Sequence, residues 1–70
     1  MQTAAIVLDK WKLDTFKRIL SDAGYIFTEH PGVDEDTVTL KVKAYNMTIL
    51  GEVIQVCNDT ADQQRKEKLN

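Results

Sequence analysis

Apolar and polar residues alternate most clearly over 37–44, where every even position is apolar and every odd position is threonine or lysine. A period of two predicts a strand that buries one face and turns the other to water or to a partner. The short apolar run 4–8 predicts another strand, with both faces largely covered. The aromatic and β-branched stretch 25–29 predicts a third, which ends at His30, Pro31 and Gly32.

A first helix is predicted by apolar residues at helical spacing from Leu13 to Ala23. Gly24 follows the last periodic position, where a left-handed residue commonly ends a helix. The start is open, because either Asp9 or Asp14 can serve as the N-cap.

A second helical pattern begins after Asn46, a good N-cap residue, and its apolar stripe is widened by Ile49 and Val56. Gly51 lowers helix propensity within it, which suggests a close approach of another backbone at that position. The polar segment 62–70 either extends this helix or frays.

The order strand, helix, strand, strand, helix defines an α+β domain of βαββα type. The second and third strands pair as an antiparallel hairpin, and a right-handed crossover from the first strand leaves a gap that the third strand fills. We therefore predict sheet order 1-3-2 with two helices on one face, a ferredoxin-like sheet that lacks its last strand. The missing strand would lie beside 4–8, so we expect a homodimer that pairs or covers this apolar edge. The alternative is that the chain's own second helix shields the edge.

Length and composition support one small domain over 1–70. A chain of this size buries only about 60% of its open surface, so self-association would strengthen a marginal monomer. The single cysteine fits a reducing compartment, and no basic leader or long apolar run is present, so we expect a cytoplasmic protein without a membrane partner. A net charge of −2 provides no global attraction for nucleic acid, which is not an expected partner.

No residue set indicates catalysis, a metal site or a cofactor site, so we expect none of these and no enzyme activity. His30 is the only histidine and precedes a proline, as a turn residue does. Cys57 lies on the apolar stripe of the second helix, where a free cysteine acts as a small hydrophobe. The acidic run 34–36 lacks the spacing of a calcium loop and is interpreted as a solvated turn.

The candidate binding surface consists of Lys10, Trp11, Lys12, Lys41 and Lys43. On the helical wheel Trp11 lies about 140° from the centre of the apolar stripe, outside the main core. With its flanking lysines it offers a stacking platform or an anchor for a protein partner. Alternatively, the segment folds Trp11 back onto the sheet edge or the second helix. Lys41 and Lys43 on the open sheet face either suit an acidic partner or only keep that face soluble.

Four short segments, 8–13, 15–16, 30–33 and 39–42, resemble small uncharacterised proteins of T4-like tailed phages and marine cyanophages. The resemblance implies a virus-encoded accessory protein that binds a host or phage macromolecule in the bacterial cytoplasm. The architecture is also similar to ACT-type regulatory domains without their final strand, although no amino-acid-binding motif is present.

The expected function is a small non-enzymatic binding protein that acts as a homo-oligomer on a protein partner. The first alternative is a small-ligand sensing or sequestering domain, with a pocket at the dimer interface between the first helix, the connection before it and the open sheet. The second is a nucleic-acid binder that uses Trp11 and the lysines.

Overall fold

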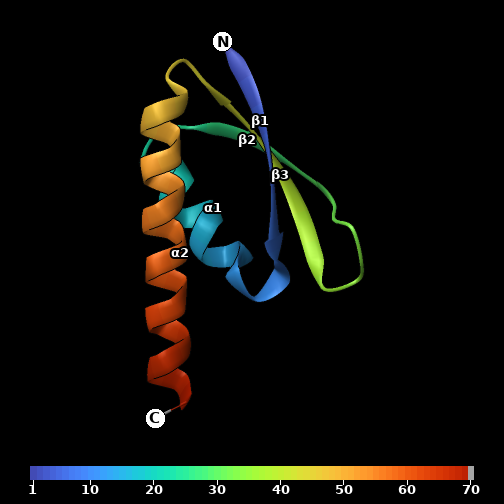
Figure 1. The fold of residues 1–70 in the computed structure, drawn as a ribbon, viewed down its shortest axis with the longest axis vertical. Helices are drawn as coiled ribbons and strands as arrows, with labels where there is room; N and C mark the ends of the chain where they lie inside the picture. Colours follow the sequence, from blue (N-terminus) through green and yellow to red (C-terminus); the bar gives the residue numbers. More distant parts are fainter. Residues whose placement is uncertain (70) are drawn as a thin grey trace.

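The computed structural model describes residues 1–69, and Asn70 lies outside the described residues. The elements follow in the order β1 (Gln2–Asp9), the 3₁₀ turn η1 (Lys10–Lys12), α1 (Leu13–Asp22), β2 (Ile26–Pro31), β3 (Thr37–Ala44) and α2 (Met47–Leu69). The three strands form one antiparallel sheet in the order β1-β3-β2, and both helices lie on the same side of it (Figure 1). The predicted α+β class and sheet order are therefore confirmed.

The core lies between β3 and the two helices. As its alternation predicts, β3 buries its even positions and exposes Lys41 and Lys43 on the other face. The most deeply buried side chains come from β3, α1 and α2 and are Phe16, Leu20, Leu40, Val42, Leu50 and Cys57. Each large apolar side chain buried in this way contributes about 1.5–3 kcal/mol to folding. The helices thus assemble on β3, which leaves its opposite face uncovered.

Both outer strands differ from the prediction. β1 was expected to be covered on both faces, but Leu8 is buried whereas Val7 is 51% exposed, because no element lies on the outer face. β2 does not end before His30; it continues through His30 and Pro31, which pair with Thr39 and Val38 of β3. A proline is tolerated there because β2 is an edge strand, whose outward N–H groups need no ladder partner.

The helix ends follow the sequence except at the start of α1. Gly24 has a φ of 85°, the left-handed conformation predicted for it. The Asn46 side-chain oxygen accepts hydrogen bonds from the Thr48 and Ile49 N–H groups at 3.0 and 3.1 Å, as an N-cap does. Neither predicted aspartate caps α1. Instead, η1 precedes it, and the Leu13 N–H donates to the Lys10 carbonyl within that turn.

The helix α2 differs from its predicted apolar stripe in two ways. Ile49 and Val56 are about half exposed rather than buried, because only one side of α2 meets the sheet and α1. A Cβ built on Gly51 meets nothing within 4 Å, so no backbone of the same chain approaches it and that prediction is wrong. Residues 62–69 continue the helix, which extends well past the end of the sheet (Figure 1).

Candidate functional site

Trp11 lies at the end of β1, where η1 meets the second half of α2. The indole is 45% exposed and lies outside the core, as the helical wheel predicts. Its ring also contacts α2, since Arg65 Cζ of that helix lies 5.0 Å from the ring centroid; Lys12 Nζ of η1 lies 5.1 Å from it. Lys12 Nζ in turn donates to Asn58 Oδ1 at 3.2 Å and lies 3.8 Å from Asp62 Oδ1. These contacts tie η1 to α2 and engage Lys12, one of the lysines of the predicted binding surface.

The five residues of the predicted binding surface do not form one surface. Lys12 reaches α2 on the helical side of the sheet, whereas Lys41 and Lys43 project from the opposite face of β3. Lys10 lies near the β2–β3 loop, where its N–H donates to the Asp36 carbonyl at 2.8 Å. The candidate surface therefore divides into a Trp11 corner and an open sheet face.

On the open face, each lysine of β3 lies in a row across all three strands. Lys41 is flanked by Ala5 of β1 and Thr28 of β2, and Lys43 by Thr3 and Ile26. In the next row, Thr39 lies between Val7 and His30. His30 is thus a strand residue rather than a turn residue, and its Nε2 lies 2.7 Å from Thr28 Oγ1. The three rows contain no acidic residue, so the open face is locally basic in a chain of net charge −2.

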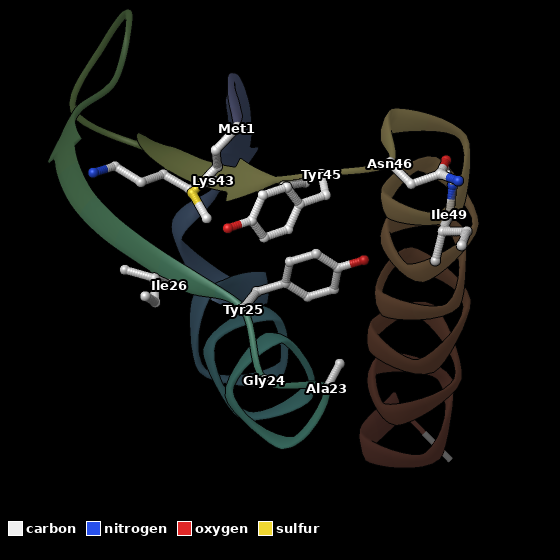
Figure 2. Close-up of a pocket in the computed structure, with 10 residues that line it drawn as sticks. Met1, Ala23, Gly24, Tyr25, Ile26, Lys43, Tyr45, Asn46 and Ile49 are labelled. Carbon is white, nitrogen blue, oxygen red and sulfur yellow. Dashed lines mark hydrogen bonds between the residues drawn. The ribbon is translucent and has the colours of Figure 1, made fainter.

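An apolar cavity of ≈ 310 Å³ lies at the opposite end of β1 from Trp11. We call it the apolar end cavity and define it by Met1, Tyr25, Ile26, Tyr45 and Ile49, with Lys43 also in its lining. Figure 2 shows the two tyrosine rings between the sheet and α2, with their hydroxyl groups pointing in opposite directions. Sequence reasoning missed this cavity, since its residues come from four separate segments. The available signal was Tyr45, an aromatic residue that follows the alternation of 37–44 on its outward side.

The two edges of the sheet are built differently. From Gln2 to Leu8, β1 has no charged residue, proline or glycine. β2 is shorter and ends at Pro31, and its Glu29 accepts a 3.0 Å ion-paired hydrogen bond from Lys17 of α1. Charges, prolines and short length are the devices that prevent edge strands from pairing with other chains. β2 has all three features. β1 is longer, and its residues 2–8 include no charge and no proline.

Cys57 and the acidic turn 34–36 have structural explanations. Cys57 is fully buried, and burial raises the pKa of its thiol, which disfavours the reactive thiolate. In the acidic turn, the Asp34 carboxylate accepts the Asp36 N–H at 2.9 Å, and Thr37 Oγ1 accepts the Val33 N–H at 3.0 Å. No three His, Cys, Asp or Glu side chains within the described part of the chain are grouped as metal ligands would be.

No family model, curated protein or solved structure matches this chain. In residues 1–69, no helix has both the length and the apolar composition needed to cross a bilayer. The described residues present three distinct surface regions: the β1 edge, the open sheet face with the apolar end cavity, and the Trp11 corner.

Proposed function

We propose that this chain is a small non-enzymatic binding protein that acts on a protein partner as a homodimer joined through β1. The observation that carries the proposal is the unprotected edge of β1. One side of this strand pairs with β3 along all eight residues, so the other side presents its N–H and C=O groups to a further strand. A second β1 is a matching partner for it.

Antiparallel pairing of two β1 strands about a two-fold axis joins two three-stranded sheets into one of six strands. A register centred near Ala5 or Ile6 keeps the core side of each strand on the helical face. On the open face, Ala5 then lies opposite Ala5 of the second copy in the first register and opposite Val7 in the second. In either register Asp9 lies opposite Met1 or Thr3 of the second copy, so no like-charged side chains face each other across this contact.

The exposed surface of the chain supports this arrangement. The chain exposes 4931 Å², whereas a compact protein of 8.0 kDa exposes about 4,400 Å². A ferredoxin-like sheet would have a further strand beside β1, and in the proposed dimer the β1 of the second copy occupies that place. The dimer thus supplies burial that the monomer lacks.

A flank of α2 also suits a second copy. Asn58 lines a cavity together with Ile6 and Leu8 of β1, and Gly51 lies two helical turns earlier on the same side of the helix. When two β1 strands pair about 4.8 Å apart, the two α2 helices on the common face meet along this flank. The open space around Gly51 allows their backbones to approach closely.

The alternatives have weaker support. The cavity between β1, η1 and α1 measures ≈ 220 Å³, below the range of about 300–1,000 Å³ usual for small-ligand pockets. Nucleic-acid binding through Trp11 would compete with the contacts of its ring to Lys12 and Arg65. The resemblance to small phage proteins fits the leading proposal, an accessory protein that binds a host or phage protein in the bacterial cytoplasm.

Ala5→Glu tests the dimer, with Thr28→Glu as the matched control. Ala5 and Thr28 flank Lys41 from opposite sides in the same row, so each new carboxylate gains the same cross-strand lysine. Only the carboxylate introduced at position 5 lies at the proposed contact between the two β1 strands. Sedimentation equilibrium should give about twice 8.0 kDa for the parent chain and for Thr28→Glu, and 8.0 kDa for Ala5→Glu. A parent chain that sediments as a monomer at micromolar concentration overturns the proposed dimer.

A further inference from the structure

We infer that the protein partner presents an acidic segment with a large apolar anchor, and that the apolar end cavity receives the anchor while Lys43 and Lys41 pair with the acidic residues. This inference rests on the proposed role as a protein-binding module. It does not depend on the dimer, since all of these residues belong to one chain.

Exposed apolar side chains are concentrated around the apolar end cavity. Four of the nine exposed large hydrophobic residues among those described line this one cavity: Met1, Ile26, Tyr45 and Ile49. Tyr45 is 85% exposed although it is aromatic, and Figure 2 shows its ring beside that of Tyr25. Exposed apolar groups scattered singly need no explanation, but their gathering around a hollow marks an interaction site. Tyrosine is also among the residues that most often dominate binding energy at protein interfaces.

A cation, the ammonium group of Lys43, lies beside the apolar end cavity. Lys43 lines the apolar end cavity and also a neighbouring hollow of ≈ 160 Å³ on the open face, which it shares with Lys41 and Ile26. Among the described residues, none with an acidic side chain lines either hollow. The ion pairs found among the described residues involve Lys12 and Lys17, so both lysines of β3 remain available to an outside carboxylate. A carboxylate there meets a local positive potential that the whole chain, at −2, does not have.

An acidic polypeptide fits this site better than a nucleic acid. Single-stranded nucleic acids are bound by aromatic side chains spread along a basic groove, one for each stacked base. Here the outward residues of β1, β2 and β3 include no phenylalanine, tyrosine or tryptophan and only one imidazole, that of His30, and the two tyrosines are gathered in one hollow at the end of the sheet. The arrangement therefore offers one apolar anchor site next to a short basic row.

The test uses blocked five-residue peptides and ¹⁵N-labelled protein. The first peptide has tryptophan between two pairs of glutamates; the second replaces the tryptophan with alanine, and the third replaces the glutamates with lysines. An oligonucleotide of eight deoxythymidines provides the nucleic-acid arm. The first peptide should shift the amide resonances of Gly24, Ile26 and Ile49 and bind at least about tenfold more tightly than the other three ligands, because both the anchor and the charge contribute.

Variants locate the binding. Lys43→Glu and Tyr45→Ala should each weaken the first peptide by about tenfold. The matched controls, Lys66→Glu and Val33→Ala, change an exposed lysine and an exposed apolar residue elsewhere and should leave the affinity unchanged. Equal binding of the lysine peptide or of the oligonucleotide overturns the inference, as does the absence of shifts around the cavity. Sedimentation of the same samples keeps the two proposals distinct: dimers that bind no acidic peptide refute only this inference, and monomers that bind it refute only the dimer.

Discussion

β1 and β2 both pair with β3 in antiparallel register, but the two edges that they form differ in how well they are protected against pairing with another strand. β2 has six residues, a terminal proline and an ion pair with α1, whereas β1 has eight residues and no charged side chain before Asp9. The same central strand therefore supports one protected edge at β2 and one edge at β1 that lacks these protective features. The difference shows that the tendency of a small domain to associate depends on what protects each backbone edge as well as on which side chains are exposed.

The largest expected effect concerns β3, on which both edges depend. Leu40 lies between Ile6 and Glu29 in the central row of the helical face and is completely buried, whereas the neighbouring Lys41 is exposed. Leu40→Ala should lower the free energy of unfolding by about 2–5 kcal/mol, through lost burial and a cavity. Lys41→Ala should change it by under about 0.5 kcal/mol. Urea melts measure both, and equal losses would contradict the inward and outward assignment of β3.

Local patterns predicted the inward and outward faces of β3 and the N-cap of α2, because each is decided within a few residues; the start of α1, which η1 precedes, was not predicted. The alternation of 37–44 and the side-chain cap of Asn46 are of this kind. What sequence reasoning missed depends on contacts between distant segments. The length of β2 follows from the pairing of His30 with Thr39. For Trp11, the sequence offered a position outside the core and a fold back onto the second helix as alternatives, and the contact with Arg65, 54 residues further along the chain, combines the two.

The candidate site divides in the same way. Lys41 and Lys43 were correctly placed on the open face, since alternation alone decides the side of a strand. Their separation from Trp11 required the direction in which η1 turns, which no local pattern fixed. The apolar end cavity was not predicted at all, because Met1, Tyr25 and Tyr45 come together only when the three strands are aligned.

An intermediate effect is expected at Gly51, on the flank of α2 next to β1. Gly51→Ala should stabilise the monomer by about 0.5–1 kcal/mol, because alanine favours the helix and its Cβ enters open space. Urea melts in the Ala5→Glu background measure this gain without the proposed dimer. In the parent background the same change should weaken dimerisation, because the Cβ separates the two α2 helices. Unchanged or stronger dimerisation would show that this flank lies outside the contact, and would leave β1 pairing to be tested by Ala5→Glu alone.

The smallest effect is expected at the closed edge, where the pair between Lys17 and Glu29 can be removed. Both side chains are more than 40% exposed, so the pair is screened by solvent and should contribute only about 0.2–0.5 kcal/mol to stability. A double-mutant cycle of Lys17→Ala and Glu29→Ala in urea measures this coupling energy. If the ion pair mainly prevents β2 from pairing with another chain, the double variant should associate more strongly than the parent in sedimentation at high protein concentration. Raised salt should likewise increase the association of the parent, because it screens the pair. If Ala5→Glu combined with the double variant stays monomeric, Pro31 and the short length of β2 are sufficient to close that edge, and the difference between the two edges lies in the backbone rather than in charge.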